Sequence, residues 1–540
     1  MSDTLDRMLT LANGFGALDW GVLALYALVL LGTGVWLSRR EQKDTEDYFL
    51  GGRRMPAWAV AISVVATSMS AASFIGVPQQ GYASDLTYLS TNIGMVFAAL
   101  IIAVFFVPAF YRARVQTIYE LLDRRLGDGS GMASSGMFLL GRVFASGARV
   151  FIGAIPLSLV LFGNEGLEPG PMMLSIGALS FVGIAYTLIG GVASVIWSDV
   201  IQFVILIGAA LGAVWIIGSQ ISAEPSEVIG ALRTGMDDGA SKLTLLDLSA
   251  DPHAPFSLLA AVIGFTLMGI GSYGTDQDLA QRLLTCKDAK GGARSIVGGI
   301  LLGIPSVALF LVLGLLLWLY YQRPDLMGGV DAAAPEDSRA VFLVFIMEQM
   351  PAGLRGLMMA GLFAAGLSSL NSAINAMSSA MVNDFYKRLA PGRDGRHYVR
   401  VGRLGVVVFG VLLGLFACGC VLVYGEHAER GGTLLTFALT VMTFAYAGLI
   451  GVFGAALLTG RGNRGSVIAA LLVGFIAVAS MQPLVWGLVM DLDAWREQHP
   501  DGDRLLWALD LAFVWKLTIA SALSFAVCVA GERPVQAPEA

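Results

Sequence analysis

The chain of 540 residues is 56% hydrophobic and only 14% charged, with a mean hydropathy of +0.72. Soluble domains carry about a quarter charged residues, so this composition excludes an ordinary soluble protein. Apolar runs of roughly 20 residues recur along the chain, and each is long enough to cross a bilayer as a helix. We therefore expect an all-α integral membrane protein that lies in a lipid bilayer.

These runs predict about 13 membrane-spanning helices. The first 17 residues lack the basic start and the cleavage site of a signal peptide, so the first span is expected to stay in the mature protein. The predicted spans are 18–38, 56–80, 87–110, 135–162, 170–190, 195–219, 254–276, 295–321, 353–384, 401–424, 433–459, 465–488 and 508–531.

Basic segments alternate with loops that are poor in Lys and Arg, and most of the 34 basic residues fall on one side of the predicted membrane. The positive-inside rule makes that side cytoplasmic. The N-terminus is then expected outside and the C-terminus inside. Abundant Ala, Gly and Arg are typical of a GC-rich bacterium, which indicates the cytoplasmic (inner) membrane of a bacterium. The basic segments are SRREQKDTEDYFLGGRR, YRARVQTIYELLDRR, QRLLTCKDAKGGAR, YKRLAPGRDGRHYVRVGR and GRGNRG.

Nothing in the sequence predicts an enzyme. The stretch GIGSYG, 269–274, matches a dinucleotide-binding fingerprint, but it follows a membrane helix rather than a strand, so we reject it. We find no nucleophile–base arrangement and no metal-ligand spacing. The outer loops 220–253 and 322–352 are acidic, and EDSRAVFLVFIMEQM is expected to form an amphipathic helix on the outer surface. No nucleic acid and no obligate protein partner is indicated.

The span at 56–80 reads AVAISVVATSMSAASFIGVPQQGYA, with hydroxyl side chains in its middle, followed by Gly76 and Pro78. Such a composition permits a break in the helix. Broken helices expose backbone carbonyls and form cation and substrate sites in transporters. The alternative is that the small residues allow neighbouring helices to pack closely.

The span at 353–384 carries a polar stripe in GLFAAGLSSLNSAINAMSSAM. Hydroxyl oxygens are hard ligands, which hard cations prefer. Helical Ser side chains also bond to the i−4 carbonyl, so Ser alone does not distinguish a ligand from a packing residue. Ser369 lies one step round the helix from the stripe. The stripe itself, at helical spacing, is Ser368, Ser372, Asn375 and Ser379.

Three ionisable residues are predicted at membrane depth, where such groups usually face the bundle interior. Arg142 and Arg149 are seven residues apart and share one helix face. Each could belong to a structural ion pair or serve as a functional charge. Asp199 is expected at the start of the span 195–219. There it could cap its helix through the helix dipole, or it could supply the negative charge of a cation site.

Spans 2–6 and spans 7–11 start from opposite sides of the membrane, which permits an inverted repeat with binding near the midplane. The span 254–276 has a Gly- and Ser-rich half, as does the span 56–80. The predicted organisation is an N-terminal extra helix and cytoplasmic loop (1–55), repeat 1 (56–220), repeat 2 (254–460) and two C-terminal extra helices (465–531).

Four motifs, in this order, carry a family resemblance: GGRRMPAWAVAISVVATSMSAASFIG, YTLIGGVASVIWSDVIQ, GTDQDLAQRLLTCKDAK and GLFAAGLSSLNSAINAMSSAMVNDFYK. With them the chain resembles the sodium–solute symporter family over nearly its whole length. The resemblance implies a LeuT-type 5+5 inverted repeat with extra flanking helices. It also implies sodium-coupled import of a small organic solute by alternating access.

The resemblance implies ion ligands by position. For the main sodium ion these are the carbonyls of Ala66, Met69 and Ala365 and the hydroxyls of Ser368 and Ser369. A second sodium, found in some members, would use Asp199, Ser368, Asn371 and Ser372, with Asn371 standing where some relatives have Ser.

The solute is expected beside these ions. The region SFIGVPQQGY…VFFVPAFYR is closer to the monocarboxylate, vitamin and iodide branch than to the galactose carriers, whose pattern is absent at Ala72, Ser73 and Asn92. Arg149 favours a carboxylate-bearing solute by charge pairing, unless it pairs with Asp276 or Asp199. A sugar or polyol symporter is the alternative, and a transporter-like sensor is more remote. The implied substrate residues are Thr67, Ser70, Ser73, Asn92, Arg149, Tyr273, Asp276 and Thr440.

Overall fold

A computed structural model describes most of the chain, and it is helical throughout, with no β-strand in the part that it describes. The described part leaves out some residues of the first basic segment, and it also leaves out Arg533. The described residues are 15–38, 44–162, 168–236, 239–329, 332–335, 338–429, 434–482, 485–486, 509 and 511–532.

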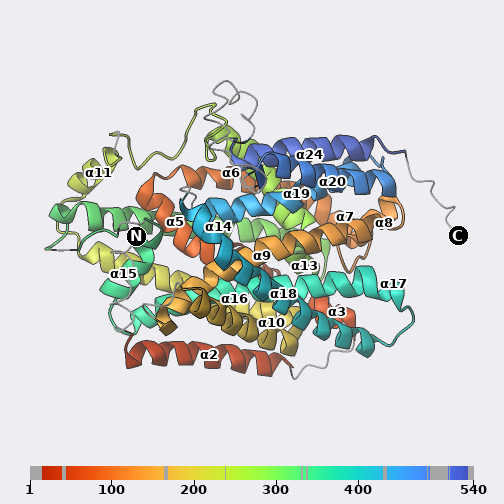
Figure 1. The fold of residues 1–540 in the computed structure, drawn as a ribbon, viewed down its shortest axis with the longest axis horizontal. Coiled ribbons are helices and arrows are strands. Elements are labelled where there is room, and N and C mark those ends of the chain that lie inside the picture. Colours follow the sequence, from red (N-terminus) through yellow and green to blue (C-terminus); the bar gives the residue numbers. More distant parts are fainter. Residues whose placement is uncertain are drawn as a thin grey trace.

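The helices lie side by side with their long axes roughly aligned (Figure 1). Four π-helical segments continue them: 102–106, 260–264, 271–275 and 381–386. Short 3-10 turns cover 51–53, 87–90, 324–326 and 338–340. The helices are α2 (Ala17–Ser38), α3 (Thr45–Leu50), α4 (Ala57–Ser68), α5 (Ala71–Ala83), α6 (Thr91–Ile101), α7 (Val107–Arg112), α8 (Glu120–Leu126), α9 (Ser130–Phe162), α10 (Pro169–Ser219), α11 (Pro225–Arg233), α12 (Phe265–Ile270), α13 (Gln277–Leu284), α14 (Ala289–Gln322), α15 (Val341–Gln349), α16 (Leu354–Ala380), α17 (Lys387–Leu389), α18 (Gly395–Glu429), α19 (Leu434–Leu458), α20 (Arg464–Ser480) and α24 (Phe513–Val529).

Among the described residues, nine helices are long and apolar enough to cross a membrane, or ten if the bent pair α4–α5 is one span. Three shorter apolar helices, 260–275, 464–480 and 513–529, fall on three further predicted spans. Each of the 13 predicted spans therefore coincides with an apolar helix. The number that crosses the bilayer, and the orientation, stay predictions.

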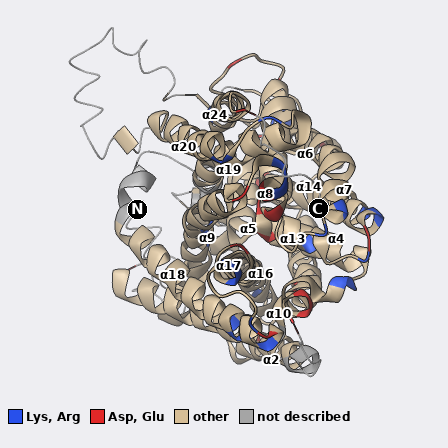
Figure 2. Ribbon diagram, turned by 90° about the vertical axis from the view of Figure 1, so that its right-hand side faces the viewer, with Lys and Arg blue, Asp and Glu red and all other residues tan. Residues whose placement is uncertain are grey.

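Lys and Arg gather at the end of the bundle that carries α7, α8 and α17 (Figure 2). These elements come from two of the segments that are predicted to be cytoplasmic. The arrangement is therefore consistent with the predicted sidedness of the chain.

The two breaks that the small residues indicate are present. Helices α4 and α5 are bent by 67° across Met69 and Ser70, and Met69 has non-helical backbone angles (φ −83°, ψ 86°). The second break follows the π-helical segment 271–275, because Asp276 is extended (φ −102°, ψ 121°) before α13 begins. Both breaks lie inside the bundle and leave helix ends buried.

Among the described helices that are long enough to cross a membrane, α16 is the most deeply buried. Every residue from 358 to 380 is buried, and the helix packs against α10, α9, α18 and α2. A helix that is buried all round belongs to the core of its bundle. Its polar stripe therefore faces protein rather than lipid.

Two sequence-based expectations about helices are wrong. The stretch around α15 is not an amphipathic surface helix, because residues 341–347 are all buried and pack against α5, α14 and α16. Asp199 does not begin its helix: α10 has its kink at Gly191 (φ 60°, ψ −162°), and Asp199 lies eight residues beyond it. Because the dipole effect is confined to the first turn, Asp199 cannot be a capping residue.

The peripheral helix α2 holds the first turn of α16. Asp19 is fully buried, and its Oδ1 accepts hydrogen bonds from the amides of Gly353 and Gly356, each at 2.8 Å. A carboxylate at a helix N-terminus satisfies free amides and interacts favourably with the helix dipole. Asp19 is thus a cap that a different helix supplies to α16.

Replacing Asp19 by Ala is expected to destabilise the protein by about 2 kcal/mol, because two amides of the first turn lose their buried acceptor. Asp288→Ala is the matched control, since Asp288 caps α14 at an exposed position through the amide of Gly291. Thermal unfolding in detergent should show the larger loss for Asp19→Ala. Equal losses in the two variants would contradict the buried-cap interpretation.

Candidate functional site

The break between α4 and α5 releases two backbone carbonyls. In a continuous helix the amide of Ser70 would bond to the carbonyl of Ala66, but here it donates to Ser68 O at 3.2 Å. The amide of Ser73, which would serve Met69, donates to Ser70 O at 2.9 Å. The carbonyls of Ala66 and Met69 thus lose their helical partners, and they are the two carbonyls predicted from this segment as cation ligands.

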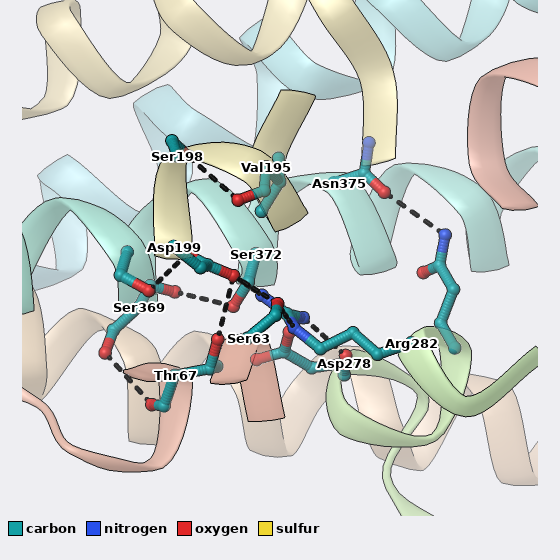
Figure 3. Close-up of polar contacts among 12 residues, drawn as sticks. Ser63, Thr67, Val195, Ser198, Asp199, Asp278, Arg282, Ser369, Ser372 and Asn375 are labelled. Atoms are coloured by element: carbon teal, nitrogen blue, oxygen red, sulfur yellow. Dashed lines mark hydrogen bonds and ion pairs between the residues drawn. The ribbon is translucent and has the colours of Figure 1, made fainter. Parts of the chain in front are cut away.

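Two hydroxyls of α16 face this break. Ser368 Oγ donates to Asp199 Oδ1 at 2.6 Å, and Ser369 Oγ donates to the carbonyl of Thr67 at 3.4 Å. A hydroxyl has one proton and two lone pairs. Because each proton is already donated to the protein, the lone pairs of both oxygens stay available to a cation. Figure 3 shows Ser369 beside Thr67 and Asp199.

Asp199 connects three helices. Its Oδ2 accepts from Ser63 Oγ and, at 3.4 Å, from Thr67 Oγ1, both on α4, while Oδ1 accepts from Ser368 on α16. The side chain is fully buried. The predicted role of Asp199 as a negative charge near the hydroxyls therefore has support in its position.

Sequence reasoning missed Arg282. Its Nη2 lies 3.0 Å from Asp199 Oδ2, its Nε donates to Ser63 at 2.8 Å, and its Nη1 lies 3.2 Å from Asp278 Oδ1 (Figure 3). Arg282 belongs to QRLLTCKDAKGGAR, a segment that its basic residues predict to be cytoplasmic. The i, i+4 spacing of Asp278 and Arg282 in DLAQR was the one available signal of a helical ion pair.

A cavity of about 140 Å³ lies next to the break. Its walls come from α4, α5, α6, α9, α12, α13, α14 and α19 and from the segments 87–90 and 271–275. Apolar side chains line part of it, among them Tyr88, Met95, Phe265 and Met268. Six of the eight predicted substrate residues line this one cavity: Thr67, Ser70, Ser73, Asn92, Arg149 and Tyr273.

Arg149 is the basic residue of this wall that is bonded to no carboxylate. Its Nη2 lies 2.9 Å from the sulfur of Met442, and its buried Nε has no hydrogen-bond partner. The other arginine of the wall, Arg142, is held by Asp276 and Asp278. A guanidinium inside the bundle that has no carboxylate partner is costly, so a ligand with a negative charge would fit this position.

Four predicted residues are placed differently. Asp276 binds Arg142 at 2.7 Å and does not line the cavity, and Thr440 is also absent from its wall. Asn371 has no hydrogen bond at its buried Oδ1 and lies next to Gly183, while Ser372 Oγ donates to Ser369 O at 3.3 Å. Neither side chain of this pair has a hydrogen bond to Asp199.

Comparison with known proteins places this geometry in a family. The family model described as the sodium:solute symporter family matches residues 48–474. The human sodium/iodide cotransporter is 29% identical over 473 residues, with 85% of this chain and 69% of that protein covered. The sodium/sialic acid symporter SiaT of Proteus mirabilis is 30% identical over 473 residues, covering 86% and 90%. These relatives are transporters and not enzymes.

Among solved structures, a Na⁺-coupled sialic acid symporter in a substrate-bound, outward-open state superimposes with a TM-score of 0.76. It is 26% identical, and the match covers 97% of this chain and 99% of the other. The fold is LeuT-like, as the resemblance implied. The two extra helices at the C-terminal end and the division into repeats stay predictions.

Proposed function

This chain belongs to the sodium:solute symporter family, and we propose that it imports a small carboxylate-bearing solute together with sodium, by alternating access. The observation that carries the sodium part is the meeting of two released carbonyls on α4–α5 with two donating hydroxyls on α16. We place the main sodium ion between them, with the carbonyl of Ala365 as the fifth ligand. The protein acts in the cytoplasmic membrane of a bacterium.

The proposed coupling follows from where the ligands lie. Sodium would join α4–α5 to α16 while the cavity is open to the outside, and so complete the solute site. The outer side would then close and the inner side would open, which exposes both solute and ion to the cytoplasm. Loss of sodium to the cytoplasm would separate α16 from α4–α5. The membrane potential adds about 2.3 kcal/mol per charge per 100 mV to the sodium gradient.

Arg149 supports a carboxylate as the solute's charged group, because it lines the cavity without a carboxylate partner. Iodide and sialic acid, in the names of two relatives, are both anions. An engineered cavity of roughly 150 Å³ holds benzene. The cavity of about 140 Å³ thus supports a compact monocarboxylate with an apolar body rather than a larger solute.

A sugar or polyol is the second candidate. The side chains of Ser70, Ser73, Asn92 and Ser272 put hydroxyl and amide groups on the same wall, and these could bond to solute hydroxyls. A transporter-like sensor is the remote alternative. A second sodium ion at Asp199 would have to share that carboxylate with Arg282, whose Nη2 lies 3.0 Å from Oδ2.

The test is uptake by the purified protein in proteoliposomes. A thermal-shift screen of short carboxylates, sugars and vitamins, each with NaCl or KCl, first selects the compound that sodium helps to bind. That compound should accumulate when a sodium gradient points inward and only equilibrate when potassium replaces sodium. Equal accumulation in both conditions would refute sodium coupling.

A further inference from the structure

A chain of five buried ionic side chains runs from α9 to α10 through the second break. Arg142 binds Asp276 through two nitrogens, at 2.7 and 3.1 Å, and its Nη1 lies 3.2 Å from Asp278 Oδ2. Arg282 continues the chain from Asp278 to Asp199. All five side chains are at most 3% exposed.

The chain holds three carboxylates and two guanidinium groups, so it carries one negative charge in excess. Charges interact strongly where the surroundings are poorly polarisable. A buried excess of one negative charge therefore favours a cation nearby. On the cavity wall, Arg149 is the basic residue that is bonded to no carboxylate, while Arg142 already belongs to the chain.

The two arginines divide their contacts differently. Arg142 forms a two-nitrogen fork with Asp276, which is the stronger geometry. Arg282 gives Asp199 only one nitrogen, since Nη1 goes to the side chain and carbonyl of Asp278 and Nε goes to Ser63. Asp199 also accepts hydrogen bonds from the hydroxyl groups of Ser63 and Ser368, which carry no charge.

We propose that Asp278 is a positioning residue for the sodium site: it draws one arm of Arg282 away from Asp199 and so leaves that carboxylate negative enough to attract sodium. Asp278 also lines the cavity, so it connects the solute site with the ion site. Without Asp278, Arg282 can turn both nitrogens onto Asp199 and neutralise it. This inference rests on the proposed function, since it assumes that sodium binds beside Ser368.

The test uses sodium alone as the ligand. The unfolding temperature of the full-length protein in detergent is measured as NaCl replaces KCl at constant ionic strength. Asp278→Asn should raise the sodium concentration for half-maximal stabilisation at least about fivefold, which is the lower edge of typical coupling between sites. A merely structural role would lower stability equally in both salts and leave the sodium midpoint unchanged.

Asp276→Asn is the matched control. It removes the same charge from the same chain, but Asp276 has no contact with Arg282, and Asn remains a good cap for α13. Its sodium midpoint should move less than about twofold. If Asp278→Asn does not fold, Asp278→Ser replaces it.

The outcomes separate the two proposals. If sodium does not stabilise the wild-type protein more than potassium does, the proposed function is refuted. Stabilisation of the wild type, with an unchanged midpoint in the Asp278 variant, would refute only the role of Asp278. An equal shift in the Asp276 and Asp278 variants would also refute it, because net charge alone would then explain the effect.

Discussion

Replacing Ser368 by Ala is expected to raise the sodium concentration for half-maximal stabilisation by about tenfold to a hundredfold. Ser368 Oγ gives its proton to Asp199 and directs its lone pairs elsewhere, so the variant loses one oxygen ligand. Polar contacts to a charged group contribute about 1.5–3 kcal/mol, and each 1.4 kcal/mol is a factor of ten. The measurement is the unfolding temperature as NaCl replaces KCl. Ser369→Ala should act in the same direction.

Ser379→Ala is the matched control for this prediction. Ser379 is buried in the same helix, but it lies eleven residues further on, at a distance of about 16 Å along the axis. Its hydroxyl accepts from Asn383 and has no contact with Asp199. The control should lose stability in both salts without a change in sodium midpoint. Wild-type sodium dependence in both Ser368→Ala and Ser369→Ala would remove these residues from the ion site.

Composition and spacing predicted the breaks well, because breaks depend on local chemistry. The serines around Met69 and the glycines of 269–274 are weak helix formers, and the sequence therefore permits a break there. The first break lies among those serines, whereas the second comes only after the glycines, at Asp276. The stripe of α16 was visible for the same reason, since helical spacing is local. Which stripe residues bind an ion was implied only by the family resemblance.

Tertiary contacts explain what the sequence did not predict. Residues 341–347 are apolar with one polar flank, and only packing against α5, α14 and α16 decides that they are buried. Arg282 follows a helix break in an eight-residue helix, too short to show its period, so it resembled a loop charge. Asp276 pairs with Arg142 because the second break brings α13 to α9, and no sequence pattern reports that contact.

Replacing Arg149 by Gln is expected to weaken the binding of small carboxylates by about tenfold to a hundredfold. The variant loses a charge-assisted hydrogen bond, worth about 1.5–3 kcal/mol. Neutral analogues should bind the variant and the wild type alike. The measurement compares benzoate with benzamide and lactate with lactamide, each by its sodium-dependent shift of the unfolding temperature.

Arg149→Lys separates charge from shape. Lys keeps the positive charge but lacks the planar fork that fits a carboxylate, so it should recover only part of the binding. Equal loss for the acid and the amide of each pair would mean that Arg149 shapes the cavity without reading charge. The sugar alternative would be favoured if glucose bound tightly to both the wild type and Arg149→Gln while none of the carboxylates bound. Sodium coupling through Ser368 and Ser369 would stand in either case, because those hydroxyls lie outside the contacts of Arg149.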